Sequence, residues 1–298
     1  MVFGKPNHLY LCVSVSLWLF SSAFSVISET SSPQQSPAFS SKVEAVRVDV
    51  LATANSQPIR GLVAADFEIL DNGVPQQVDL VSFEQIPLNV ILALDMSDSV
   101  AGDRLEHLRG AGRALLGGLK KDDQAALVTF SHRVTLGAAL TSDAAVVRQA
   151  LDAATASGNT ALIDGAYAAV MLGESDAGRA LVIVFSDGLD TSSWLTASAV
   201  LDNAKRSDAV VYGVSVQSRV KPEFLRDLTS FTGGRLFEVE KTANLASIFL
   251  GVLEEFRQRY LVSYTPRGVA RDGWHTLDVR IKSRKATIKA RPGYLAGS

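Results

Sequence analysis

The pattern of hydrophobic positions in the first part of the chain indicates β-strands. Apolar and polar residues alternate from Val43 to Leu51 and from Val78 to Phe83, which is typical of half-buried strands. Between these runs, Phe67–Leu70 leads into Asp71-Asn72-Gly73, and an Asn-Gly pair accepts the positive φ angles of a tight hairpin turn. This part of the chain therefore predicts a small antiparallel unit.

From Leu88 onward, short continuous apolar runs alternate with segments of helical period. The runs predict strands buried on both faces, at Asn89–Leu94, Ala125–Phe130, Ala180–Phe185 and Ala209–Val214. The helical segments are Leu105–Leu119, Ala144–Ala154, Ala161–Leu172, Thr196–Arg206, Pro222–Thr229 and Ala243–Arg257. This alternation predicts an α/β fold, with a doubly wound, mostly parallel sheet covered by helices on both faces.

The tail returns to strand patterns at Tyr260–Tyr264, Thr276–Lys282 and Ala286–Arg291. We expect it to fold back onto the amino-terminal strands, so that the two flanks form one small β-sandwich-like module. The predicted organisation is an amino-terminal β-rich segment at 42–86, a central α/β domain at 87–257 and carboxy-terminal strands at 258–298.

The first residues have the pattern of a secretory signal peptide. Lys5 precedes an apolar run from Leu9 to Phe24, and Ala23-Phe24-Ser25 places small residues at the positions that a signal peptidase reads. We expect a signal peptide at 1–28, a disordered linker rich in Ser, Pro and Gln at 29–41, and export to the periplasm or the extracellular space. An uncleaved anchor is the alternative, but the run is shorter than the ~20 residues that span a bilayer.

Composition narrows the classes of function. Cys12 is the only cysteine, so the cleaved chain would contain neither disulfides nor thiolate sites. The net charge of −2 gives no argument for nucleic acid or an anionic membrane as partner. The basic stretch from Arg280 to Arg291 has alternating charges, as the exposed face of an antiparallel hairpin would, and affinity for an anionic polymer is the alternative interpretation.

Oxygen-bearing side chains follow two of the predicted strands. Asp95-Met96-Ser97-Asp98-Ser99 ends the first buried strand, and Ser186-Asp187-Gly188 ends the strand that starts at Ala180. Gly158-Asn159-Thr160 lies in a loop that leads to the same edge, where open α/β sheets bind ligands. An all-oxygen set favours Mg²⁺, Mn²⁺ or Ca²⁺ over zinc or copper, whereas the alternative is a set of unrelated helix caps and turn formers.

With these motifs, residues 87 to 255 resemble the von Willebrand factor type A family, which includes the integrin inserted domains. The resemblance implies a metal-ion-dependent adhesion site in which Ser97, Ser99 and Thr160 coordinate a divalent cation, which we expect to be Mg²⁺, with Mn²⁺ or Ca²⁺ as alternatives. Asp95 and Asp187 would contact the ion directly or through water. One coordination position would stay open for a carboxylate of the partner.

Two further acidic residues near this site have open roles. Asp98 stands where many members of the family carry glycine, so it could raise the affinity for the cation or simply face solvent. Asp190 could support the site from outside the ligand shell, although a solvated loop carboxylate is the simpler interpretation.

The flanks resemble a bacterial group of exported proteins that carry this domain. The shared segments are Gly61-Leu62, Asp66–Ile69, Asp71–Gln76, Phe83, Tyr260-x-x-x-Tyr264 and Arg291-Pro292-Gly293-Tyr294. This second resemblance implies export and a binding role but names no substrate.

The sequence predicts a metal-dependent protein-binding module whose partner is a protein with an acidic side chain. We expect no catalytic or cofactor-binding residues, because Ser97 lies in no nucleophile elbow and the histidines are scattered. The alternatives are a structural domain whose metal meets no partner and, less favoured, a phosphohydrolase that uses Asp95. In integrin-type domains the last helix moves on ligand binding, but a fixed amphipathic helix is the simpler interpretation of Ala243–Arg257.

Overall fold

The computed structural model describes residues 45–83, 86–174, 178–218 and 220–297, which all belong to one structural unit. The predicted signal peptide at 1–28 and linker at 29–41 lie outside the described residues. Within the described ranges, every helix is too short or too polar to cross a membrane.

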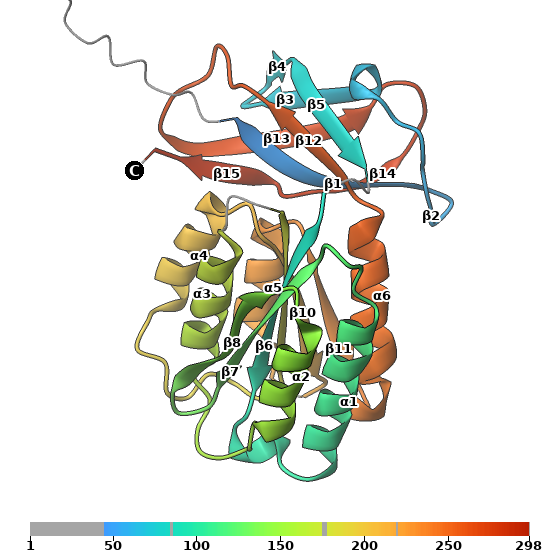
Figure 1. Cartoon of the computed structure of the whole chain (residues 1–298). Helices are drawn as coiled ribbons and strands as arrows, with labels where there is room; N and C mark the ends of the chain where they lie inside the picture. Colours follow the sequence, from blue (N-terminus) through green and yellow to red (C-terminus); the bar gives the residue numbers. More distant parts are fainter. Residues whose placement is uncertain (1–44, 84–85, 175–177, 219, 298) are drawn as a thin grey trace, which may run out of the picture. The chain divides into compact units, whose positions relative to one another are not determined.

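A six-stranded sheet forms the centre of the described structure, in the order β11-β10-β9-β6-β7-β8 (Figure 1). Its strands are β6 (Leu88–Asp95), β7 (Gln124–Phe130), β8 (Val134–Thr141), β9 (Arg179–Ser186), β10 (Val210–Val216) and β11 (Arg235–Val239). All neighbours are parallel except β8, which runs antiparallel to β7. The prediction of a doubly wound, mostly parallel sheet is confirmed.

The two edge strands, β8 and β11, were not among the predicted strands. Both lack the continuous apolar run of a central strand, because each pairs on one side only and leaves several side chains at the surface. A buried run identifies a central parallel strand well, but it does not identify an edge strand.

Six helices cover the sheet among the described residues: α1 (Asp103–Gly117), α2 (Ala144–Ala153), α3 (Leu162–Gly173), α4 (Ala197–Arg206), α5 (Glu223–Phe231) and α6 (Leu245–Arg257). Their bounds differ from the predicted ones by at most two residues. Side-chain caps fix some of the starts: Asp143 accepts a hydrogen bond from the Ala145 amide at α2, and Thr196 accepts one from the Ala199 amide at α4.

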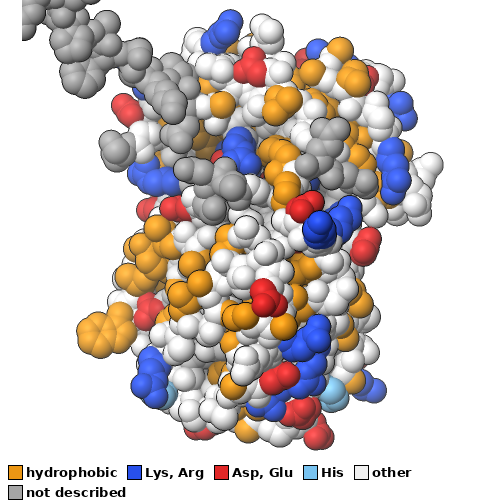
Figure 2. Space-filling view, viewed as in Figure 1, with side chains coloured by type: hydrophobic (Ala, Val, Ile, Leu, Met, Phe, Trp, Pro, Cys, Tyr) orange, Lys and Arg blue, Asp and Glu red, His pale blue; other side chains and the backbone are white. Residues whose placement is uncertain are grey.

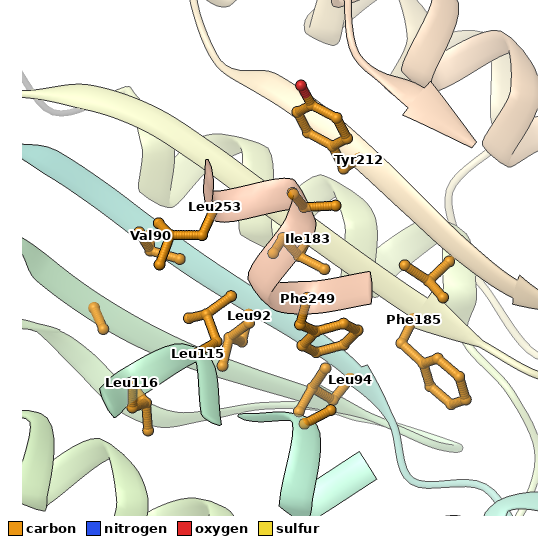
Figure 3. Packing of buried hydrophobic residues seen from close by; sticks show 14 of the residues in the cluster. Val90, Leu92, Leu94, Leu115, Leu116, Ile183, Phe185, Tyr212, Phe249 and Leu253 are labelled. Carbon is orange, nitrogen blue, oxygen red and sulfur yellow. The ribbon is translucent and has the colours of Figure 1, made fainter. Parts of the chain in front are cut away.

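The alternation of side chains along β6 divides the core into two layers. Val90, Leu92 and Leu94 point into a cluster with α1, α2 and α6, and Figure 3 shows these three packed with Leu115 and Phe249. The residues between them point to the opposite face, where α3, α4 and α5 pack. Every residue of β6 is buried, so this strand is the axis of the domain.

The flanks of the central domain contribute two further sheets. One has the order β14-β1-β12-β5 with β2 beside β1, and the other has the order β15-β13-β3-β4. The strands are β1 (Val46–Ala54), β2 (Gln57–Pro58), β3 (Phe67–Asp71), β4 (Val74–Gln76), β5 (Val78–Phe83), β12 (Tyr260–Tyr264), β13 (Gly273–Ile281), β14 (Thr287–Lys289) and β15 (Gly293–Ala296). We call these two sheets the flank sheets. In both of them strands from the two ends of the chain pair, β1 with β12 and β3 with β13.

The flank sheets contain the predicted hairpin but not the predicted basic one. Asn72 and Gly73 have φ angles of 47° and 80° and join β3 to β4, as expected of an Asn-Gly turn. In contrast, β13 and β14 belong to different sheets and do not pair. Arg291 is buried and donates to the carbonyl oxygens of Ser207 at 3.1 Å and Arg47 at 2.6 Å, so the basic stretch is not one exposed face.

The motif residues of the flanks converge on the buried carboxylate of Asp71. The hydroxyls of Tyr264 and Tyr294 each donate to Asp71 Oδ2 at 2.9 Å, and Nδ1 of His275 lies 2.7 Å from Asp71 Oδ1. Burial, together with the hydrogen bond to this carboxylate, raises the pKa of both tyrosines, so they stay protonated donors. These motif residues therefore hold the two ends of the chain together.

Buried arginines join the flank sheets to the central domain. Arg179 opens β9 and pairs with Asp49 of β1, with Nε 2.8 Å from Oδ1, and both side chains are almost completely covered. Arg259 is fully buried directly before β12 and donates to the Tyr212 hydroxyl at 2.9 Å. The amino ends of the central strands therefore face the flank sheets, and their carboxyl ends lie at the opposite end (Figure 1).

We predict that Arg179→Met destabilises the protein by about 3–5 kcal/mol, because it leaves the Asp49 carboxylate buried without its partner. Urea unfolding followed by circular dichroism measures the change. Arg113→Met is the matched control, since it breaks an ion pair with Asp152 in which both side chains are more than two-fifths exposed, and it should cost at most about 1 kcal/mol. Equal losses in the two variants would show that the buried pair has no special role.

Candidate metal centre

The candidate residues lie where the strand order of the central sheet reverses. The chain passes from β6 to β7 on one side and later returns to β9 on the other side of β6. The loops that follow β6 and β9 therefore diverge from neighbouring strand ends, and a crevice at such a switch point is the usual ligand site of an open α/β sheet. Asp95 is the last residue of β6, and Asp187 directly follows β9.

Asp95 is a carboxylate without access to water. It is 0% exposed, and its two oxygens accept from the Ser97 amide at 2.8 Å and the Ser186 hydroxyl at 2.7 Å. Desolvation by burial raises the pKa of Asp95 despite these hydrogen bonds, and the nearby Asp187 charge adds to the rise. A nearby cation would offset the cost of keeping this carboxylate ionised.

A chain of hydrogen bonds connects the other residues of the first loop to Asp187. The hydroxyls of Ser97 and Ser99 lie 3.0 Å apart, and the Ser99 hydroxyl donates to Asp187 Oδ1 at 2.6 Å. Arg104, in the first turn of α1, forms an ion pair with Asp187 Oδ2 and donates to the Ser99 carbonyl at 3.2 Å. The side chain of Asp187 has no exposed area beneath these contacts.

Thr160 is held beside the loop after β9. Its amide donates to the Thr191 hydroxyl at 3.0 Å, and its carbonyl accepts from the Thr191 amide at 2.8 Å. A β-carbon added to Gly188 would lie 3.9 Å from the Thr160 hydroxyl, so that hydroxyl faces the turn that contains Asp187. The loop that contains Thr160 also contacts the loop after β6, because the Asp98 amide donates to the Gly158 carbonyl at 3.0 Å.

The acidic residues with open roles have different surroundings. Asp98 is exposed. Asp190 accepts from the Ile163 amide at 3.2 Å and from the Ser193 hydroxyl, so it fastens its loop to the start of α3 instead of standing free in solvent.

The donor set suits a hard cation. Within the described ranges no three or more His, Cys, Asp or Glu residues are grouped so that they could hold an ion. The centre instead combines two carboxylates with three hydroxyls, which are oxygen donors of the type that Mg²⁺, Mn²⁺ and Ca²⁺ accept. Two participants were not found from the sequence. In the sequence Ser186 reads only as the end of a strand, and the helical periodicity around Arg104 gives no sign of its pairing with Asp187.

Comparison with known proteins identifies the central domain. Residues 89–250 match the von Willebrand factor type A domain. The chain belongs to this family. The family's α/β sheet with helices on both faces is the architecture described above.

The similar curated proteins share only part of their length with this chain. An uncharacterized protein of Synechocystis is 31% identical over 83 residues, which is 27% of this chain and 20% of that protein. Inter-alpha-trypsin inhibitor heavy chain H2 of the pig is 25% identical over 182 residues, or 55% of this chain and 20% of that protein. The chain thus spans about a fifth of the length of these relatives.

Solved structures show the same fold at low identity. A von Willebrand factor type A protein from Catenulispora acidiphila has a TM-score of 0.53 and 14% identity, and the match covers 77% of this chain and 72% of that one. Proximal thread matrix protein 1 from the mussel byssus has a TM-score of 0.54 and 17% identity, with 62% and 49% covered. That mussel protein was solved with a zinc-occupied metal-ion-dependent adhesion motif.

We predict that Asp95→Asn raises the melting temperature of the protein in EDTA at neutral pH. Because the folded-state pKa of Asp95 lies above its unfolded value, its contribution to stability is present at low pH and is lost as pH rises through the raised pKa. An amide removes the buried charge and retains an acceptor for Ser97. Thermal unfolding from acidic to neutral pH should show the largest gain at the neutral end, and a variant less stable than wild type there would contradict this.

Proposed function

We propose that this protein is an exported binding module in which a divalent cation bridges to a carboxylate of a partner protein. The cation would be held by Ser97, Ser99 and Thr160, with Asp95 and Asp187 in direct or water-mediated contact. One observation carries the proposal: a buried carboxylate and a hydrogen-bonded set of hydroxyls lie together at the switch point of a von Willebrand factor type A domain. Domains of this family are typically protein-interaction modules.

The charge balance at the centre supports an acidic partner. Asp187 is already paired with Arg104, so Asp95 is the carboxylate whose charge is left for the ion. Hydroxyl ligands bring no charge. A divalent ion there would therefore keep a residual positive charge, and a carboxylate is the protein group that best satisfies it.

Magnesium is the ion that we favour, with Mn²⁺ and Ca²⁺ as alternatives. Hydroxyl and carboxylate oxygens are hard donors, and Mg²⁺ commonly keeps part of its coordination shell for water or another molecule. The zinc found in the mussel protein supports a divalent cation in general at such a motif, so zinc belongs in the test.

Export and the division of the chain belong to the same proposal. The leader pattern at 1–28 supports secretion or a periplasmic location. The binding domain would be 87–257, and the segments 42–86 and 258–298 would form the module that carries it. We propose binding instead of catalysis for the centre, because domains of this family are mostly non-enzymatic.

We predict that the purified, metal-stripped protein binds one divalent ion, and that Asp95→Ala and Thr160→Ala each abolish binding. Isothermal titration calorimetry with Mg²⁺, Mn²⁺, Ca²⁺ and Zn²⁺ measures this. Asp202→Ala is the matched control, because Asp202 is an exposed carboxylate on α4 that forms an ion pair with Lys205 in the following turn. Equal binding by wild type and both site variants would overturn the metal site.

We predict that Arg104→Gln tightens cation binding several-fold, because the guanidinium competes with the ion for the Asp187 carboxylate. The gain should shrink as salt is added, since Arg104 is partly exposed and its charge is screened. Calorimetric titration at low and high ionic strength checks both effects, and Arg113→Gln is the control for loss of a surface guanidinium. Weaker binding by Arg104→Gln would mean that Arg104 orders the site instead of competing for it.

A further inference from the structure

The loop between β9 and α4 exposes apolar side chains beside the candidate metal centre. Trp194 is 94% exposed, and Leu189 and Leu195 are 48% and 38% exposed. Figure 2 shows hydrophobic side chains gathered on the side of the domain where α3 and α4 lie. An exposed tryptophan is unusual in a soluble protein, because its indole is a large apolar surface whose burial lowers the free energy.

This exposure does not arise from a loose segment. The two oxygens of Asp164, in the first turn of α3, accept from the amides of Trp194 and Leu195 at 2.9 Å each. In return the Asp164 amide donates to the Ser193 hydroxyl at 3.1 Å. The backbone at Trp194 is thus clamped to α3 while the indole extends into solvent.

The same loop is tied to the metal centre at its other end. It begins with Asp187, and Thr191 exchanges hydrogen bonds with Thr160 directly before α3. The backbone that carries the indole is therefore fixed relative to the residues proposed to hold the cation. A partner that reached the cation with a carboxylate would meet this loop.

The side chain has the properties of a binding anchor. Tryptophan is enriched among the few interface residues that carry most of the binding energy. A clamped backbone leaves little loop entropy to lose on binding, which is the advantage of a preorganised anchor. No hydrogen bond of the fold uses the side chain of Trp194 among the described contacts, so its removal should leave the domain intact.

We propose that Trp194, flanked by Leu189 and Leu195, is the apolar anchor of the partner-binding surface. The partner is a protein segment that presents an acidic side chain for the cation and, next to it, apolar side chains that cover the indole. This inference rests on the proposed function, since it specifies what surrounds the acidic residue of the partner.

The test uses a phage-displayed library of short random peptides, selected on the purified protein in Mg²⁺. We expect enrichment of peptides in which Asp or Glu has apolar neighbours. One enriched peptide is then synthesised in three forms: unchanged, with the acid replaced by its amide, and with the apolar neighbours replaced by serine. Affinities are measured by calorimetry for wild type, Trp194→Ser, Trp194→Phe and the control Leu136→Ser, which removes an apolar side chain that is 53% exposed on β8.

In wild type we expect both altered peptides to bind more weakly. Trp194→Ser should weaken the unchanged peptide roughly tenfold or more, Trp194→Phe should restore part of the loss, and Leu136→Ser should change nothing. Trp194→Ser should also bind peptide equally with or without the apolar neighbours. Thermal unfolding confirms that each variant is folded.

The outcomes separate this inference from the proposed function. If replacing the acid of the peptide weakens binding but replacing its apolar neighbours or Trp194 does not, the anchor is wrong and the metal-bridged function stands. If replacing Trp194 weakens binding but replacing the acid of the peptide does not, the anchor stands as an apolar site and the metal bridge is wrong. The proposed partner would be overturned if no peptide with both an acidic residue and apolar neighbours were enriched on wild type. It would also be overturned if wild type formed concentration-dependent dimers that Trp194→Ser did not form.

Discussion

Asp95 places a carboxylate at the end of a strand that is buried along its whole length, and water does not reach it. An ionised group in that position must be satisfied from within the protein. The Ser97 amide and the Ser186 hydroxyl satisfy both oxygens, which fixes the first turn after β6 and joins it to β9. The loop geometry at this edge follows from that requirement, and the resulting set of oxygens gives the centre its affinity for a cation in our proposal.

At the opposite end of the sheet, buried positive charges must likewise be satisfied from within the protein. Arg179 and Arg259 are buried between the central domain and β1 of the flank sheets. Arg179 pairs with Asp49, and Arg259 donates to the Tyr212 hydroxyl and lies 3.7 Å from the Glu255 carboxylate. Because α6 ends two residues before Arg259, its carboxyl end is attached to this buried contact, and its apolar face packs in the core. These contacts describe a helix held at its end and along its length, as expected of a fixed helix. The sequence favours a fixed helix, and movement of α6 on ligand binding is the alternative hypothesis.

The motifs of the chain divide into those that join its two ends and those that form the candidate metal centre. Asp71, Tyr264 and Tyr294 come from the flank motifs and form one buried hydrogen-bonded cluster, so their pattern reflects the closing of the chain upon itself. The motif that follows β6 lies at an edge that faces away from these sheets. Next to this motif, the loop that carries Trp194 is held by hydrogen bonds to its backbone amides, and its largest side chain is exposed. This division is the reason that we propose the binding role for one end of the central sheet.

Local pattern by itself determined the buried strands, the six helices to within two residues, the Asn72-Gly73 turn, and the order of the five candidate ligands along the chain. Periodicity and turn chemistry are properties of neighbouring residues, so they can be recognised in a sequence. Tertiary structure alone decided the edge strands β8 and β11, the separation of β13 from β14, and the burial of Arg291. It also decided that Ser186 and Arg104 belong to the centre and that Asp190 fastens α3. Except for β8, which pairs with the preceding strand and has mostly uncovered side chains, these features depend on contacts between residues distant in the chain, and one sequence carries no local signal for such a contact.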